Sequence, residues 1–400
     1  MHPFFNLTSP DFIRDPYPFY EQLRRTDPYY RSPFGFYAVV RDRDVRAVLT
    51  DKRFGRAFMS PPSDRIPKPQ IHKPIVQSTT KWMMFRNPPD HTRLRGLFVK
   101  AFTAKRILDM RPRIQAIVDQ ALDRLAQRSQ ADAIADFATE IPVTVICELL
   151  GIPREDREIF WVNARGLIRL LDPVPLSAAE MDRADAQHSI LSDYFGRLFE
   201  QRRKNPQDDL TTQLVLTEEQ GDRLSTEELT GNMILLFAAG HDTTAGLIGN
   251  ALLALLHHPD QLARLRADPS LMPNAVEEFL RYDSSVQLAS RVALEDLTLG
   301  DKMLAEGTTV ACVLASANRD PEAYDEPDRL DVARPDIRVV AFGGGIHHCI
   351  GAQLARLEGE IAIGGIIRRF PNLALDERDQ PVWRTSITLR ALTRLPVRLR

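Results

Sequence analysis

The chain contains 400 residues, of which 44% are hydrophobic and 26% are charged, and its formal net charge is -2. This composition is typical of a globular protein with a large core, and the lack of a basic surplus argues against binding to nucleic acid. The three cysteines, Cys147, Cys312 and Cys349, are too few for a disulfide framework, so we expect a reducing compartment. Because the sequence has neither a signal-like N-terminus nor a run of about 18 apolar residues, we expect a cytoplasmic protein without a membrane span.

From the N-terminus, hydrophobic patterning predicts a short strand at 36–40 and a helix at 42–49. Residues 60–69 are too rich in proline for a helix or a central strand and are predicted to form a loop. Helical periodicity predominates after this loop, at residues 91–102, 104–127, 184–204, 226–256 and 259–266. Short strands are predicted late in the chain, at residues 292–299, 309–314 and 387–399. The chain is therefore predicted to be mainly α-helical with a smaller β-rich part.

The most informative segment is residues 342–351, with the sequence FGGGIHHCIG, which leads into a predicted helix. Its glycines let the backbone approach a bulky flat group, and the start of a helix directs N–H groups toward the sulfur of Cys349. A thiolate held in this way is how haem iron is ligated when oxygen is activated. Two other interpretations are an inert buried cysteine in a turn and a cysteine hydrolase. A zinc site is disfavoured because His347, His348 and Cys349 are contiguous and no second ligand pair occurs.

A second unusual segment lies in the middle of the predicted helix 226–256, where residues 238–244 read AAGHDTT. Its small residues remove bulk from one helix face, and Asp242 and Thr243 place an acid beside an alcohol in an otherwise apolar helix. Burial of an unpaired carboxylate costs several kcal/mol of free energy, or the group takes up a proton and becomes neutral. We therefore expect the acid to be retained for a function. The alternative is a polar patch that faces solvent.

Residues 342–351 match the signature F-x-x-G-x-H/R-x-C-x-G of the cytochrome P450 superfamily, and residues 239–244 resemble its oxygen-binding motif A-G-x-D/E-T-T/S. The resemblance implies the cytochrome P450 fold in one haem domain over residues 1–400. It implies heme b as the cofactor, with the Cys349 thiolate as the axial ligand of the iron. It also implies that Asp242 relays protons from solvent and that Thr243 hydrogen-bonds water and oxygen.

The superfamily pattern extends to residues that would bind the cofactor or support its loop. His91 and Arg95 lie four residues apart in a segment similar to the haem-facing helix of the family. The resemblance implies this cofactor-binding set: His91, Arg95, Arg291, Phe342, Gly343, His347, Cys349 and Gly351. It further implies that Glu278, Arg281 and Arg334 form a structural charge network, because an E-x-x-R pair and a later arginine precede the family's cysteine.

The substrate pocket is implied only by the resemblance, and it is expected to bind a hydrophobic small molecule. Aromatic and methionine side chains near residue 82 are, on their own, more typical of a plain core. The expected lining residues are Trp82, Met84, Leu235, Ala238, Ala239, Val286, Gln287 and Ile387, and Gln287 could orient a polar group of the substrate.

These features predict a monomeric monooxygenase that hydroxylates a hydrophobic small molecule with O2. Electrons are expected from a separate ferredoxin and ferredoxin reductase, because no flavin- or nicotinamide-binding segment is recognised. The expected docking cations are Arg93, Lys100, Lys105, Arg106 and Arg356. The alternatives are a peroxygenase, a haem-thiolate isomerase, or a non-catalytic haem- or lipid-binding protein. The pair Asp242 and Thr243 argues against a peroxygenase or an isomerase.

Overall fold

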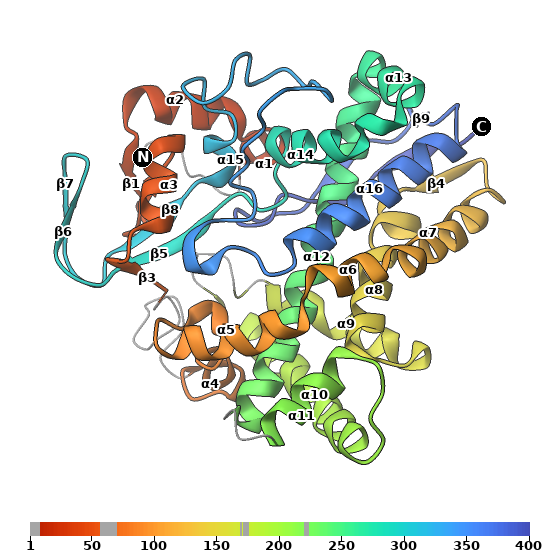
Figure 1. Ribbon diagram of the computed structural model, residues 1–400. Coiled ribbons are helices and arrows are strands. Elements are labelled where there is room, and N and C mark those ends of the chain that lie inside the picture. Colours follow the sequence, from red (N-terminus) through yellow and green to blue (C-terminus); the bar gives the residue numbers. More distant parts are fainter. Residues whose placement is uncertain (1–8, 57–69, 169, 171–175, 220–223) are drawn as a thin grey trace. The chain divides into compact units, whose positions relative to one another are not determined.

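The computed structural model describes residues 9–56, 70–168, 170, 176–219 and 224–400. Helices predominate in this part of the chain, and the sheets are small, as Figure 1 shows. The chain folds into two compact units. Unit 1 comprises Met1–Phe54, Met110–Pro142 and Asp242–Arg400, and unit 2 comprises Gly55–Asp109 and Val143–His241.

The helices are distributed over both units. Those of unit 1 are α1 (Pro10–Arg14), α2 (Tyr17–Thr26), α3 (Asp42–Thr50), α7 (Arg111–Leu125), α13 (Pro259–Ala267), α14 (Met272–Tyr282), α15 (Leu314–Ala317) and α16 (Ala352–Arg369). Those of unit 2 are α4 (Pro74–Thr79), α5 (Asp90–Ala101), α6 (Ala104–Asp109), α9 (Arg157–Ile168), α10 (Ala178–Lys204) and α11 (Leu210–Glu219). Two helices, α8 (Glu140–Leu150) and α12 (Thr226–His257), contribute residues to both units.

The strands lie in unit 1, apart from the last residue of β3. They are β1 (Tyr29–Arg31), β2 (Tyr37–Val39), β3 (Phe54–Gly55), β4 (Gln130–Asp132), β5 (Ala289–Ala293), β6 (Leu297–Leu299), β7 (Lys302–Leu304), β8 (Thr309–Cys312), β9 (Ala374–Leu375), β10 (Val382–Trp383), β11 (Leu392–Arg394) and β12 (Pro396–Arg398). The largest sheet has the order β1-β2-β8-β5-β3, in which β2 and β8 are parallel. The other sheets are β4-β12-β9, β6-β7 and β10-β11.

The predicted elements near the N-terminus are found, and one predicted helix is divided in two. The strand and helix expected at 36–40 and 42–49 correspond to β2 and α3. The single helix expected at 104–127 is instead α6 and α7, because Pro112 stands at the start of α7 and cannot continue a preceding helix. The proline-rich loop expected at 60–69 lies outside the described residues.

Helix α10 begins earlier than its hydrophobic periodicity predicts, at Ala178 instead of residue 184. The reason is a capping box: the Ser177 hydroxyl accepts from the Glu180 N–H at 3.2 Å, and the Glu180 carboxylate accepts from the Ser177 N–H at 2.7 Å. The helices α1, α2, α4, α8, α9, α11 and α15 were not predicted.

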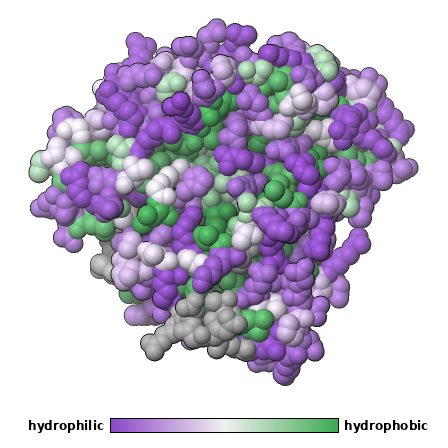
Figure 2. Space-filling view, in the orientation of Figure 1, coloured by the Kyte–Doolittle hydropathy of each residue, from purple (hydrophilic) through white to green (hydrophobic). Residues whose placement is uncertain are grey.

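Apolar side chains are concentrated in the core, where α3 and the largest sheet share a cluster that includes Val39, Val48 and Val310. On the face shown in Figure 2, hydrophilic residues predominate and apolar residues form small patches. No helix among the described residues combines the length and the apolarity that a membrane crossing requires.

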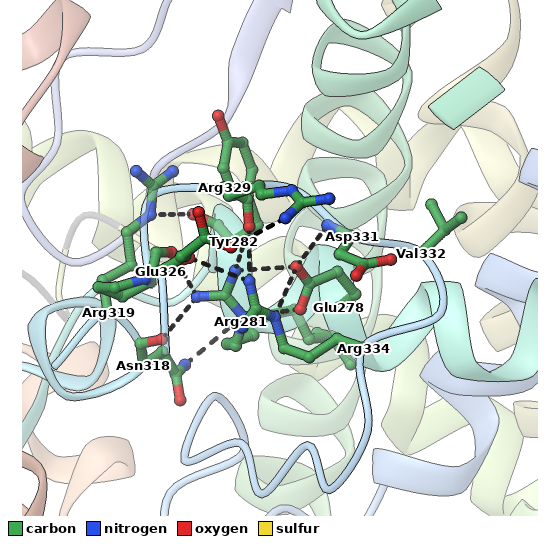
Figure 3. Close-up of polar contacts among 12 residues, drawn as sticks. Glu278, Arg281, Tyr282, Asn318, Arg319, Glu326, Arg329, Asp331, Val332 and Arg334 are labelled. Atoms are coloured by element: carbon green, nitrogen blue, oxygen red, sulfur yellow. Dashed lines mark hydrogen bonds and ion pairs between the residues drawn. The ribbon is translucent and has the colours of Figure 1, made fainter. Parts of the chain in front are cut away.

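A buried charge network joins α14 to the loops that follow α15 (Figure 3). Both carboxylate oxygens of Glu278 accept from Arg281, at 2.6 and 2.8 Å, and one also accepts from Arg334 at 3.2 Å. Arg281 and Arg334 donate in addition to main-chain carbonyls between residues 318 and 329. The structure thus brings together the three residues that the sequence pattern selected, and it fixes an irregular segment to a helix.

The network reaches residues 342–351, the cysteine loop, through Asn318. The carbonyl of Asn318 accepts from Arg281 at 3.1 Å, and its side-chain oxygen accepts from the Val340 N–H at 2.9 Å. Val340 in turn accepts from the Gly343 N–H at 2.8 Å. Three hydrogen bonds therefore connect the Arg281 guanidinium to the start of the loop that carries Cys349.

We predict that Glu278→Gln lowers the free energy of unfolding by about 3 to 5 kcal/mol, because it leaves two buried guanidiniums without a counter-charge. Glu278 and Arg281 are both 0% exposed. A matched control is Glu326→Gln, which removes a carboxylate at the same i, i+3 spacing from an exposed ion pair with Arg329. Thermal unfolding followed by circular dichroism should show a large shift for the first variant and none for the second; equal shifts would contradict the prediction.

Candidate active site

The thiol of Cys349 is exposed, whereas Cys147 and Cys312 are each 0% exposed. The backbone N–H of Cys349 donates to the Phe342 carbonyl at 3.0 Å, and this hydrogen bond closes the loop. Gly351 is the N-cap of α16, and the nearest atom to a Cβ built there is the Cys349 Sγ, at 4.0 Å. The loop therefore presents one accessible sulfur at the start of a helix, with little side-chain bulk beside it.

Glycine is required at Gly345 by both conformation and space. Its φ is +64°, and a Cβ there would lie 2.4 Å from the Leu49 carbonyl oxygen at the end of α3. Gly343 also has a positive φ, of +69°. These two residues let the loop turn closely against α3 and reverse direction before the short 3₁₀ turn Gly345–His347.

Arg291, in β5, is a buried cation beside this loop. It is 2% exposed, and its guanidinium donates to the carbonyls of Ser290 at 3.0 Å and Gly344 at 3.2 Å. No carboxylate among the described residues forms an ion pair with it, and burial lowers the pKa of Arg291. A buried cation that has only carbonyl partners fits an anionic ligand, such as a carboxylate of a cofactor.

Two further predicted cofactor residues lie in unit 2, on α5. His91 is buried, and burial together with the positive charges of Arg95 and Arg56 lowers its pKa to about 4. Arg95, one turn later, is half-buried. An anion bound near these side chains would find a positive field. In unit 1, His347 is half-buried within the 3₁₀ turn of the loop.

Phe342, the first residue of the cysteine loop, is covered by a cation. The Arg356 guanidinium lies 4.4 Å from the centroid of its ring and forms an ion pair with Glu277. This contact is within the range of a cation–π interaction and joins α16 and α14 to the loop.

Helix α12 runs without a break through the AAGHDTT segment. Leu235 and Ala238 are buried, whereas Ala239, Gly240 and Thr243 are partly accessible. The last three are spaced so that they share one face of the helix. Within this segment the small residues Ala239 and Gly240 belong to unit 2, whereas Thr243, which carries a hydroxyl, belongs to unit 1.

Asp242 lies on a different face of α12. It is 3% exposed, and its Oδ2 atom accepts from the Arg384 guanidinium at 2.7 Å. Arg384 follows β10, and sequence patterns did not select it, because an isolated arginine near the C-terminus belongs to no recognisable motif.

Two predicted substrate residues of unit 2 lie just before α5. Trp82 is buried, its ring stacks on Phe85 with centroids 6.0 Å apart, and it contacts α12 at Gly231. Met84 is half-buried. In unit 1, Val286 is half-buried and forms a β-bridge with Leu389, in the same C-terminal segment as the buried Ile387.

The side chain of Gln287 is hydrogen-bonded at both ends of its amide. Its side-chain oxygen accepts from the Tyr20 hydroxyl at 3.0 Å, and its side-chain nitrogen donates to the Ser284 carbonyl at 2.7 Å. The residue is 2% exposed. Both ends of the amide are therefore hydrogen-bonded within the protein, and contact of Gln287 with a substrate stays a prediction.

The expected docking cations are largely neutralised. Arg93 pairs with Glu228 at 2.5 Å, Lys105 with Asp109 at 2.6 Å and Arg106 with Asp208 at 3.7 Å. Arg356 pairs with Glu277. These ion pairs weaken the expectation of a basic docking surface built from these residues.

Comparison with known proteins identifies the family. The family model of cytochrome P450 matches residues 19–390. Cytochrome P450 107B1 of Saccharopolyspora erythraea is 44% identical over 368 residues, which are 90% of this chain and 88% of that protein. Vitamin D(3) 25-hydroxylase of Pseudonocardia autotrophica is 42% identical over 401 residues, which are 98% of this chain and 96% of that protein.

A solved structure gives the same result for the fold. P450BioI, in complex with an acyl carrier protein ligated to hexadec-9Z-enoic acid, has a TM-score of 0.91 and 36% identity, and the match covers 98% of this chain and 100% of that one. The chain has an exposed cysteine in a glycine-rich loop, and its relatives match it over most of its residues. It belongs to the cytochrome P450 family of haem-thiolate monooxygenases.

Proposed function

We propose that this monooxygenase hydroxylates a hydrophobic small molecule at an unactivated C–H bond, with Cys349 as the axial ligand of its haem. The observation that carries the proposal is the accessible Cys349 thiol in a loop that passes directly beside the buried cation Arg291. A haem offers a metal for the thiolate and carboxylates for the cation. When bound, the haem supplies the oxygen-activating chemistry.

The residues around the cofactor would hold and orient it. We propose that Arg291, His347, His91 and Arg95 receive the propionates. Phe342, Gly343 and Gly351 would provide the ring contact and the space that the cysteine loop needs beside the macrocycle. The support for this assignment is the burial of Arg291, which forms no ion pair with a carboxylate in the part of the chain that the structure describes, and the cationic setting of His91.

Asp242 and Thr243 would deliver protons to the reacting oxygen atoms. Insertion of one oxygen atom from O2 into a C–H bond consumes two protons and two electrons and releases one water. Thr243 lies on the accessible face of α12 and would hold water by hydrogen bonds, while the buried Asp242 would exchange protons with solvent.

The substrate is proposed to be a hydrophobic molecule with a polar end, of the size of a fatty acid or a sterol-like skeleton. The support comes from two relatives, one named as a vitamin D(3) 25-hydroxylase and one solved with a fatty acid on an acyl carrier protein. The apolar side chains of Trp82, Leu235 and Ile387 are consistent with such a ligand.

Electrons are proposed to come from a separate ferredoxin and ferredoxin reductase in the cytoplasm. The support is that no flavin- or nicotinamide-binding segment is recognised among these 400 residues. Four of the five expected docking cations already have carboxylate partners. Other groups would therefore have to contribute to the binding of the ferredoxin.

Cys349→Ala is predicted to abolish the red-shifted absorption band of the reduced, carbon monoxide-bound protein, because this band requires a thiolate ligand. NADH-driven product formation with a surrogate ferredoxin should be lost as well. Cys147→Ala and Cys312→Ala are matched controls, since both thiols are buried, and they should retain the band. The proposal is wrong if Cys349→Ala keeps the band.

Arg291→Gln is predicted to accelerate haem loss about 10- to 100-fold, because a charge-assisted hydrogen bond to a propionate contributes about 1.5 to 3 kcal/mol. The measurement is transfer of haem to excess apomyoglobin. The control is Arg53→Gln, which removes an exposed arginine paired with Asp51. Unchanged haem retention in Arg291→Gln would remove Arg291 from the cofactor site.

Thr243→Ala and Asp242→Asn are predicted to divert electrons from product to hydrogen peroxide or water, while substrate binding is kept. Loss of one positioned acid–base group costs about 10²- to 10⁴-fold in rate. Peroxide and product per NADH oxidised measure the effect, and a substrate-induced shift of the haem band checks binding. Fully coupled turnover by both variants would refute the relay.

A further inference from the structure

We propose that Arg384 is a positioning residue for Asp242. Its guanidinium keeps the acid ionised and directed toward the C-terminal hairpin, which is formed by β10 and β11. Arg384 thus lies at the solvent end of the proton relay. The inference rests on the proposed relay role of Asp242 and adds a residue that no motif identifies.

The first observation is the pair itself. Arg384 Nη1 lies 2.7 Å from Asp242 Oδ2, which is the distance of a strong, charge-assisted hydrogen bond. The Asp242 side chain is 3% exposed and that of Arg384 is 27% exposed. Arg384 thus contacts both the buried carboxylate and the solvent, and it connects the two.

The second observation is that a whole face of α12 lies against the segments that carry Arg384. Asp242, Gly246 and Asn250 are spaced by four residues and share this face. A Cβ on Gly246 would lie 2.9 Å from Ser285 and 3.3 Å from Ala391. The Asn250 side chain donates to the carbonyl of Arg390 at 3.0 Å. The packing of this face therefore places the Asp242 backbone close to the segment that carries Arg384.

The third observation is that the backbone of Arg384 is fixed. Its N–H donates to the Ala391 carbonyl at 2.9 Å, and its carbonyl accepts from the Ser386 N–H at 3.2 Å. The same turn carries Ile387, a proposed substrate residue, and its end is tied to Ser285 by the Arg390 N–H at 2.8 Å. Arg384 is thus part of a rigid turn and not a freely moving surface side chain.

These contacts determine how the pair can act. A carboxylate buried without a counter-charge takes up a proton and becomes neutral, whereas a guanidinium remains charged at any pH of interest. Arg384 therefore keeps Asp242 as a carboxylate that can accept a proton from water. When Asp242 is protonated, its attraction to Arg384 falls, and the acid can turn toward the Thr243 side of the helix. After it has passed the proton on, the ionised carboxylate returns to Arg384.

The deciding measurement is infrared difference spectroscopy of the ferric holoenzyme at neutral pH. We expect Arg384→Met to gain the C=O stretch of one protonated carboxylic acid, shifted in D2O. The band should be absent from Arg384→Lys, which keeps the charge, and from the double variant Arg384→Met/Asp242→Asn, which lacks the acid. A matched control is Arg394→Met, which removes another arginine–carboxylate pair, with Asp379, from the same two-stranded sheet.

A second readout is the peroxide formed per NADH in ferredoxin-driven turnover with myristic acid as the probe. Arg384→Met should raise this fraction as Asp242→Asn does, and the two changes together should have no larger effect than Asp242→Asn alone. The inference is overturned if Arg384→Met gains no acid band, or if it adds the same increment in the Asp242→Asn background. If Asp242→Asn alone leaves peroxide unchanged, the proposed relay fails instead, and the infrared result still decides whether Arg384 controls the charge of Asp242.

Discussion

The cysteine loop depends on the ion pairs that the buried Glu278 carboxylate forms with two arginines. Two guanidiniums meet this carboxylate, and each also binds main-chain carbonyls of an irregular segment that has no regular secondary structure of its own. Such a segment must satisfy its carbonyls through side chains. Asn318 then carries the connection to Val340 and to the start of the loop. The thiolate site is therefore supported by hydrogen bonds that begin on α14, far from the sulfur in sequence.

Three arginines differ in their burial and in the partners of their charge. Arg281 is completely buried and has the carboxylate of Glu278, so its role is structural. Arg291 is 2% exposed, and its partners among the described residues are carbonyls, so it fits an anionic ligand. Arg384 is intermediate, because its carboxylate partner is buried while the guanidinium itself reaches solvent. The residue type is the same in all three, and the partner decides the function.

Helix α12 has residues of different exposure in its middle. Ala239, Gly240 and Thr243 are small and partly accessible. Asp242, Gly246 and Asn250 form a face that packs tightly against the C-terminal hairpin and the segment near Ser285. The acid and the alcohol are neighbours in sequence but lie about 100° apart around the helix. Proton transfer between them therefore needs a side-chain rotation or a water.

The sequence by itself determined the family, the ligand cysteine, the acid–alcohol pair and most of the long helices. These features depend on local order: a glycine loop before a helix, or apolar residues at a helical period. Tertiary structure decided which charges meet. Asp242 and Arg384 are separated by 142 residues and Gln287 and Tyr20 by 267, so no local pattern records either contact. The same holds for the ion pairs of Arg93 with Glu228 and of Arg356 with Glu277, because an arginine has the same appearance in the sequence whether it faces solvent, a cofactor or a carboxylate.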